Sequence, residues 1–266
     1  MKIYALNLHR APNRRVHVAQ QLDRCGIPAE IVPAIDGRDI VLSDNQVVDP
    51  FAIRAGLLGD RPPAIASGVG CALSHLEVYR RILLDGHGSA LVVEDDVVLP
   101  PDLDVLTGAI ARHMTGAAVT LLHFSHPGGP CKITSGNSVA LPGSRLLVYP
   151  VDTRLLASAA AYVITAEACR RLTTVAPPVR SKADAWELFR SAGAVDSIRC
   201  VVPMPVTVAL AFRSTIDYYS SNSMQARFRE QLGNVNVPFV KQLLAFRRGR
   251  SFRRRGWTGE YEFADS

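Results

Sequence analysis

The chain has 266 residues, of which 48% are hydrophobic and 20% are charged. This composition allows a sizeable buried core and makes disorder over most of the length unexpected. The five cysteines are widely spaced and form no Cys-x-x-Cys pair, so neither a disulfide framework nor a structural zinc site is expected. Cys71 lies in an apolar helical pattern and is interpreted as a small core residue.

The net charge is +6, and much of the positive charge is concentrated near the C-terminus. Such a basic segment can contact phosphate-rich partners, or it can be a solvated tail without a dedicated partner. Three aromatic residues interleave with the arginines, which favours a peripheral membrane contact over nucleic acid. The arginines are Arg247, Arg248, Arg250, Arg253, Arg254 and Arg255, and the aromatics are Phe246, Phe252 and Trp257.

Nothing in the sequence predicts a secretory signal or a membrane span. The apolar run at the N-terminus is too short for a signal, and no stretch approaches the roughly 20 apolar residues needed to cross a bilayer. We therefore expect a cytoplasmic protein whose basic C-terminus can contact the anionic inner face of the membrane.

In chain order, short apolar runs alternate with helical patterns. Lys2 to Leu8 predicts a buried strand, Pro12 opens a helix that runs to Asp23, and 29–34 predicts a second strand. This βαβ unit indicates a parallel pair of strands. Residues 41–63 predict a long irregular excursion, and 127–144 predict a Gly/Pro-rich loop. Helices are predicted at 67–85 (capped by Ser67), 102–113, 165–172 (capped by Thr165) and 183–191. Further strands are predicted at 90–93, 118–124, 158–164 and 198–202.

Strands that alternate with helices predict an α/β fold. We expect a single Rossmann-type domain over residues 1–215, with a mostly parallel central sheet flanked by helices. Residues 216–266 are predicted to form a helical, basic C-terminal extension.

The acidic triplet Glu94-Asp95-Asp96 directly follows the apolar strand at 90–93. Adjacent carboxylates repel one another near a low-dielectric core, so they raise one another's pKa or need a cation. Because side chains alternate along a strand, Glu94 and Asp96 are expected on the same side, where two oxygen ligands suit Mg²⁺ or Mn²⁺. The triplet thus predicts a metal site held by Glu94 and Asp96, against the alternative of a solvated acidic turn.

Ser74 and His75 lie next to each other on the predicted helix before the acidic strand. Adjacent helical side chains diverge, so the two cannot form a nucleophile–base pair and hydrolase chemistry based on them is rejected. They are interpreted as hydrogen-bonding groups for a donor or acceptor, and a core histidine bonded to the backbone is the alternative for His75.

Five short motifs resemble glycosyltransferase family 25, which contains bacterial lipo-oligosaccharide galactosyltransferases and collagen galactosyltransferases. They occur in the family's order over residues 2 to 190. The motifs are Asn7-Leu8-His9-Arg10 with Arg14-Arg15, Ala34-Ile35-Asp36-Gly37, Gly70-Cys71-Ala72-Leu73-Ser74-His75, Val93-Glu94-Asp95-Asp96-Val97 and Ala161-Tyr162-Val163-Ile164-Thr165. The resemblance implies a GT-A-like fold, a UDP-sugar donor, Mn²⁺ or Mg²⁺ as cofactor, and inversion at the anomeric carbon. Galactose is the default sugar, and the expected acceptor is a saccharide such as lipopolysaccharide, lipo-oligosaccharide or another glycoconjugate.

Asn7, Arg10, Arg14 and Arg15 lie where the first strand meets the first helix and are expected to contact the nucleotide, and Asp36, in the turn after the second strand, is expected to accept a hydrogen bond from the ribose or the base. A helix N-terminus favours anions, and arginine grips phosphate in a fork. The predicted donor-binding residues are Asn7, Leu8, Arg10, Arg14, Arg15, Asp36, Ser74 and His75.

An inverting transfer needs a base for the acceptor hydroxyl. Asp184, at the start of a short helix, is the first candidate, and Glu187 is the second. Asp95 or Asp96 can serve instead if the other carboxylates hold the metal.

Two other function classes remain open from the sequence. A metal-dependent phosphoryl hydrolase would use the same carboxylates to activate water and would turn over without an acceptor. A non-catalytic module that binds membrane or nucleic acid through the basic C-terminus would show strong salt dependence of binding.

Overall fold

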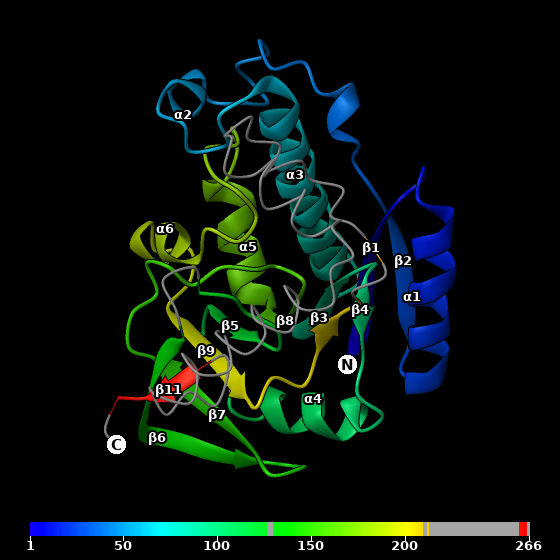
Figure 1. Ribbon diagram of the computed structural model, residues 1–266, viewed down its shortest axis with the longest axis vertical. Coiled ribbons are helices and arrows are strands. Elements are labelled where there is room, and N and C mark those ends of the chain that lie inside the picture. The colour runs from blue at the N-terminus through cyan, green and yellow to red at the C-terminus, as the bar shows by residue number, and fades with distance from the viewer. Residues whose placement is uncertain (127–129, 210–211, 213–260, 265–266) are drawn as a thin grey trace, which may run out of the picture.

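A nine-stranded mixed sheet forms the centre of the protein in the computed structural model, which describes residues 1–126, 130–209, 212 and 261–264. The strand order is β11-β6-β7-β9-β5-β8-β3-β1-β2 (Figure 1). The strands are β1 (Lys2–Leu8), β2 (Ala29–Ala34), β3 (Ser89–Glu94), β5 (Ala118–Leu121), β6 (Cys131–Leu141), β7 (Arg145–Pro150), β8 (Ala161–Thr165), β9 (Ser197–Val202) and β11 (Tyr261–Phe263).

Helices cover both faces of this sheet. Alternation along β1 sends Tyr4 and Leu6 into a core with α3, α5 and α6, and it sends Ile3 and Ala5 into a second core with α1 and α4. A third, smaller cluster packs α2 against α3. The helices are α1 (Pro12–Cys25), α2 (Pro50–Arg54), α3 (Pro62–Leu84), α4 (Leu103–Ala111), α5 (Ala166–Val175) and α6 (Trp186–Ser191), and a 3₁₀ turn spans Gly37–Asp39. No helix in the described part of the chain is long and apolar enough to cross a membrane.

The α/β class is confirmed, but the prediction of a mostly parallel sheet is wrong. β1 runs parallel to β2 and β3, as the βαβ pattern indicated. In contrast, β8 is antiparallel to both β3 and β5, and β7 is antiparallel to both β6 and β9. Hydrophobic runs locate buried strands but carry no information on strand direction, which depends on the path of the connections.

The predicted loop at 127–144 is a hairpin in its described part. β6 and β7 pair antiparallel, with an irregular register between Thr134 and Val139. The polar tract Ser135-Gly136-Asn137-Ser138 lies in this irregularity, and Asn137 has a φ of 60°. This polar tract interrupts the apolar alternation at the two ends of β6, which is why the sequence predicts a loop there.

The structure also differs from the prediction at α3 and at the C-terminus. Prolines 62 and 63 begin α3 because proline is tolerated in a first helical turn, so this helix starts before the predicted cap at Ser67. Within the predicted helical extension, Tyr261–Phe263 form β11, which pairs parallel with β6. The basic segment at 247–255 and its aromatics lie outside the described residues, so the predicted membrane contact stays a prediction.

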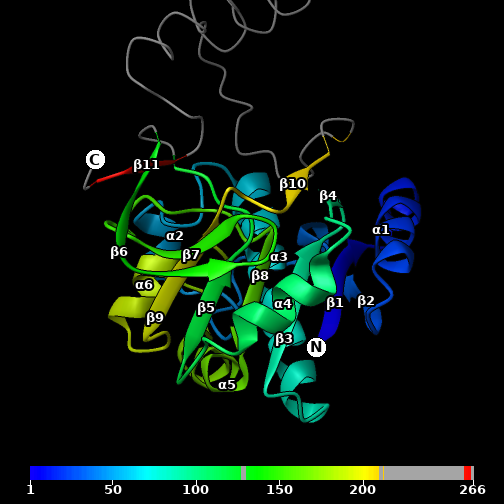
Figure 2. The ribbon, with the colours of Figure 1, turned by 90° about the horizontal axis from the view of Figure 1, so that it is seen from below.

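Two short strands hold the chain just after the acidic triplet. β4 (Val97–Val98) pairs antiparallel with β10 (Thr207–Val208), and the two lie side by side in Figure 2. The backbone N–H of Ala209 donates to the carbonyl of Asp96 over 2.7 Å. The turn that carries Asp95 and Asp96 is therefore fixed on its far side by this second, small sheet.

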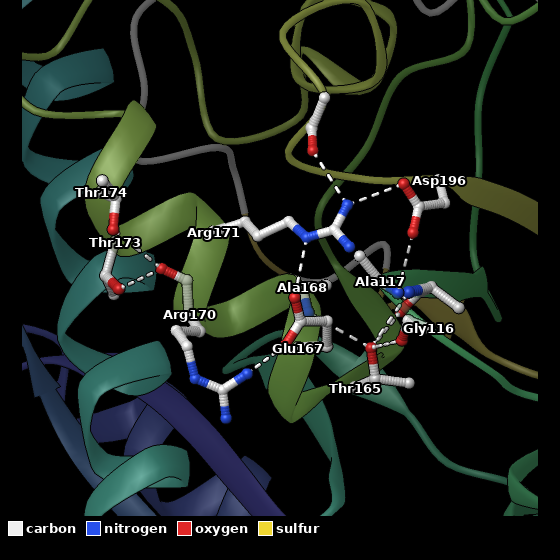
Figure 3. A network of polar contacts seen from close by, with 12 residues as sticks. Gly116, Ala117, Thr165, Glu167, Ala168, Arg170, Arg171, Thr173, Thr174 and Asp196 are labelled. Atoms are coloured by element: carbon white, nitrogen blue, oxygen red, sulfur yellow. Dashed lines mark hydrogen bonds and ion pairs between the residues drawn. The ribbon is translucent and has the colours of Figure 1, made fainter.

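Thr165 joins α5 to the sheet, as Figure 3 shows. Its hydroxyl donates to the carbonyl of Gly116 (2.8 Å) and accepts from the backbone N–H groups of Ala118 (3.0 Å) and Ala168 (3.3 Å). The prediction that Thr165 caps this helix is confirmed. Arg171 on the same helix bonds Asp196, whose carboxylate accepts from the N–H of Ala117 (Figure 3).

Replacement of Thr165 by valine keeps the shape of the side chain and leaves two backbone N–H groups without their acceptor. We expect the free energy of unfolding to fall by about 1–3 kcal/mol, measured by urea denaturation. The matched control is T165S, which retains the hydroxyl and should lose less. Equal stability of T165V and T165S would contradict the role assigned to the hydroxyl.

Candidate functional site

A pocket opens where β1, β2 and β3 end against α3, and it encloses about 570 Å³ of empty space that is continuous with solvent. This edge is the carboxyl end of three parallel strands, where ligands bind in open α/β sheets. Many of the predicted site residues line it, together with Cys71, which was predicted to be a core residue. The lining includes Leu8, Arg10, Arg14, Ser74, His75, Glu94 and Asp95.

Gly37 and Gly70 bring the wall of this pocket together. A Cβ atom on Gly37 would lie 2.6 Å from the carbonyl oxygen of Ala66, and one on Gly70 would lie 2.8 Å from that of Ile35. The turn after β2 therefore rests directly on the backbone of α3. This contact sets the side of the pocket between the Arg10 region and the Cys71–His75 face of the helix.

Asp95 is buried at the end of β3 and is held by two donors. Asn7 Nδ2 lies 2.7 Å from Asp95 Oδ2, and Arg14 Nη1 lies 2.6 Å from Asp95 Oδ1. Asn7 comes from the end of β1, and Arg14 comes from the first turns of α1. Both oxygens of Asp95 are thus occupied by protein groups, which does not suit the predicted role of catalytic base.

Asp96 accepts from the same guanidinium, with Arg14 Nη2 at 2.9 Å from its Oδ2. Its Oδ1 is buried without a hydrogen-bond partner among the described residues. Burial, and after it the neighbouring charge of Glu94, raise the pKa of Asp96 to about 6 against the opposing effect of Arg14. β3 ends at Glu94, so the expected strand alternation that would bring Glu94 and Asp96 to one side does not extend to Asp96.

Glu94 is the partly exposed member of the triplet and faces α3. Its Oε1 lies 3.8 Å from His75 Nε2, which exceeds a hydrogen-bond distance. Cys71, His75 and Glu94 offer one sulfur, one nitrogen and one oxygen atom that all lie within 4.8 Å of one another. Burial, together with the charges of Glu94 and Asp184, raises the pKa of the Cys71 thiol well above its usual value.

His75 is oriented by a chain of two tyrosines. Its Nδ1 lies 2.7 Å from the hydroxyl of Tyr162, which lies 2.8 Å from the hydroxyl of Tyr79. The imidazole also stacks on the Tyr162 ring with 5.7 Å between centroids. These contacts aim the other ring nitrogen, Nε2, toward Glu94 and the pocket. A core histidine bonded to the backbone, the alternative from the sequence, does not describe this arrangement.

Asp36 is bound by two arginines at the mouth of the pocket. Its carboxylate accepts from Arg38 Nη2 (2.6 Å) and from Arg10 Nε (2.7 Å). The hydrogen bonds from Arg38, and then those from Arg10, hold the pKa of Asp36 well below its ordinary value. Asp36 therefore fixes Arg10, and the two terminal nitrogens of Arg10 have no bond to other described residues and can meet an anion.

Ser74 lines the pocket and also bonds two backbone groups, and its predicted contact with a donor or acceptor stays a prediction. Its hydroxyl donates to the carbonyl of Gly70 (2.6 Å) and accepts from the N–H of Ile35 (2.8 Å). The side chain is buried, and the bond from Ile35 ties the end of β2 to α3, whereas the bond to Gly70 lies within α3. Arg15 is exposed on the outer side of α1, and it does not line the pocket.

The two candidate bases on the late segment lie in different places. Asp184 Oδ2 accepts from the N–H of Ser158 (2.9 Å), a residue with a φ of 93°, and the Asp184 charge acts on Cys71. Glu187 instead bonds Arg190 and Thr153 and lines a separate surface pocket. The hydrogen bonds from Arg190 and Thr153 lower the pKa of Glu187 to about 2.

Two residues that the sequence reasoning did not use belong to the site. Cys71 was assigned to the core, although its spacing of four residues from His75 puts both on one helix face. Tyr162 was noted only as part of a motif on a strand. Its contact with His75 joins residues 87 positions apart and could not be read from local spacing.

Comparison with known proteins adds evidence of descent for the first half of the chain. Residues 1–126 match the profile of glycosyltransferase family 25, described as an LPS biosynthesis protein family. A glycosyltransferase 25 family member of Aedes aegypti is 31% identical over 110 residues, which are 37% of this chain and 16% of the relative. Human procollagen galactosyltransferase 2 is 29% identical over 105 residues, which are 36% of this chain and 16% of the relative.

Not every relative is named as an active enzyme. The mouse protein called inactive glycosyltransferase 25 family member 3 is 29% identical over 101 residues, which are 36% of this chain and 16% of that protein. The matched segment spans only about one sixth of the length of these relatives. The resemblance of this chain to glycosyltransferase family 25 is confirmed, and residues 1–126 carry it.

Proposed function

We propose that this protein is a glycosyltransferase with a GT-A-like fold that moves a hexose, galactose by default, from a UDP-sugar to a saccharide acceptor such as lipo-oligosaccharide. One observation carries the proposal: the acidic triplet ends an inner strand at a pocket, beside arginines at the start of α1. The family match over residues 1–126 supports it.

The proposed donor site uses Arg10 as its phosphate contact. Asp36 holds Arg10 through Nε over 2.7 Å and directs the guanidinium to the pocket mouth. The negative charge of a diphosphate suits this position, because arginine binds phosphate oxygens with two nitrogens at once. Arg14, in contrast, is committed to Asp95 and Asp96, so we assign it to positioning the triplet.

A divalent cation suits the negative charges of the acidic triplet. Asp95 and Asp96 share one buried guanidinium, Glu94 adds a third negative charge beside them, and Asp96 Oδ1 is buried without a partner among the described residues. Glu94 and Asp96 are near enough for the charge of Glu94 to raise the pKa of Asp96. In this proposal Glu94 and Asp96 would hold Mn²⁺ or Mg²⁺, and the ion would neutralise the negative charge of the leaving diphosphate.

Asp184 is the proposed base for the acceptor hydroxyl in an inverting transfer. Asp95 is held by Arg14 and Asn7, and Glu187 is bound by Arg190 in a different pocket, which favours Asp184 among the three candidates. The bond from the Ser158 N–H to Oδ2 orients the Asp184 carboxylate. Its other oxygen, Oδ1, is then the atom that would accept the proton.

Transfer from UDP-galactose and other UDP-sugars, assayed with Mn²⁺ and with chelator, tests the function and the cation together. We expect E94Q and D96N each to lower kcat/KM by about 100-fold or more, because each removes a charge from the cation site. The control is E77Q, which removes a carboxylate from α3 that pairs with Arg81. Full activity in chelator, or unchanged activity in both E94Q and D96N, would argue against the proposal.

The base assignment is tested by comparing D184N with D184A. The asparagine carbonyl can still accept from the Ser158 N–H, whereas alanine removes both that bond and the charge. We expect D184N to lower kcat by about 10²–10⁴-fold while its thermal unfolding stays close to that of the wild type. Activity of D184N within a few-fold of the wild type would assign the base to another residue.

The positioning role of Arg14 predicts a stability effect that a mere phosphate contact would not produce. R14M leaves Asp95 and Asp96 buried without their counter-charge, so the free energy of unfolding should fall by about 3–5 kcal/mol at neutral pH. In R14M/D95N/D96N the buried charges are absent, and we expect much of this loss to be recovered. Urea denaturation of the wild type and both variants measures it, and an R14M protein as stable as the wild type would refute the role.

A further inference from the structure

One sulfur, one nitrogen and one oxygen atom that could each bind a metal ion lie close together on the α3 side of the pocket. Cys71 and His75 lie one helical turn apart on α3, and Glu94 ends the neighbouring β3. Their donor atoms all lie within 4.8 Å of one another, and all three residues line the pocket. Of these three residues, the proposed UDP-sugar site uses only Glu94, so it leaves Cys71 and His75 unexplained.

The state of His75 is the second, independent observation. Its side chain is 2% exposed, and Nε2 is buried with no hydrogen-bond partner in the described part of the chain. An unpaired buried ring nitrogen is costly unless something binds it. The hydroxyl of Tyr162, 2.7 Å from Nδ1, holds the ring with Nε2 facing the sulfur and the carboxylate. Histidines that bind metals are held through their other ring nitrogen in the same way.

We propose that Cys71 Sγ, His75 Nε2 and the Glu94 carboxylate bind one Zn²⁺ whose fourth coordination position opens into the pocket. Zinc bonds of about 2.0–2.3 Å at tetrahedral angles separate donor atoms by about 3.3–3.7 Å. The observed 3.8 Å between His75 Nε2 and Glu94 Oε1 needs only a small adjustment. When the sulfur binds, the thiol releases its proton to solvent, and the thiolate and carboxylate together neutralise the ion.

The three ligand atoms select zinc over the Mn²⁺ or Mg²⁺ of the proposed UDP-sugar site. Thiolate and imidazole favour Zn²⁺, whereas Mg²⁺ and Mn²⁺ favour oxygen ligands. Three protein ligands with one open position are typical of zinc sites that bind water or a substrate atom. Glu94 is common to both sites, whereas Cys71 belongs only to the zinc site and Asp96 only to the proposed donor site. Variants at these two positions therefore separate the two proposals.

Cobalt titration of the chelator-treated full chain tests the zinc site without any sugar donor. We expect one equivalent of Co²⁺ to give a thiolate-to-cobalt absorption band in the near ultraviolet, and Zn²⁺ to abolish it by displacement. The band should disappear in C71S and persist in D96N. The matched control is C25S, which removes a partly exposed cysteine on α1 and should keep the band. Y162F, which keeps the ring and loses the hydroxyl, should weaken Zn²⁺ binding about 10–100-fold.

A second measurement needs no variant. Zn²⁺ should slow the alkylation of Cys71 by iodoacetamide in the wild-type protein, followed by mass spectrometry of the modified peptide, and leave the rate at Cys25 unchanged. Absence of the cobalt band in the wild type, its persistence in C71S, or alkylation of Cys71 that is indifferent to Zn²⁺ would each overturn the zinc site. None of these outcomes depends on transferase activity.

Discussion

Three carboxylates follow one another at the end of β3, and two of them, Asp95 and Asp96, are buried. Buried negative charge has to be compensated, and the guanidinium of Arg14 does so by reaching both residues from α1. The same contact fixes α1 to β3 across the end of β1, where Asn7 adds a further bond to Asp95. The position of the first helix, the course of the acidic turn and the floor of the pocket all depend on this one ion-pair cluster.

The end of β3 therefore presents two chemically different sides. Asp95 and Asp96 turn toward the cationic start of α1, where oxygen ligands and arginines dominate. Glu94 turns toward α3, where it meets an imidazole and a thiol. A single change of direction in the backbone, where strand gives way to turn after Glu94, separates the two environments. Glu94 borders both environments and is therefore the residue that the two proposed metal sites share.

Much of the fold could be predicted from local pattern. The first βαβ unit, the strand before Glu94 and the cap at Thr165 follow from apolar periodicity and capping chemistry, which act over a few residues. The antiparallel direction of β8 and the pairing of β6 with β7 could not be predicted, because both depend on how distant segments meet. The tract at 135–138 also concealed its strand, since glycine, asparagine and serine carry no alternation.

The residues of the site likewise fall into those that local sequence pattern could locate and those that depend on contacts between distant segments. Arg10, Glu94 and Asp95 were each predicted as site residues, and all three line the pocket at the edge where parallel strands end together. Ser74 was assigned from the family motif, and Glu187 was assigned as a second candidate base on the predicted helix at 183–191. The Ser74 hydroxyl forms hydrogen bonds with backbone groups of Gly70 and Ile35, and the Glu187 carboxylate accepts from Arg190. The spacing of Cys71 and His75 was visible in the sequence, but their third neighbour, Glu94, comes from another element.

The contact of Gly37 and Gly70 has a consequence for how the pocket can vary. Backbone meets backbone there, with a Cβ on either residue 2.6–2.8 Å from the facing main-chain oxygen. The spacing between the β2 turn and the helix is consequently a rigid dimension, insensitive to side-chain rotamers. A change in the size of the ligand that the pocket accepts would then come from lining side chains such as Leu8, which can be exchanged without moving this backbone contact.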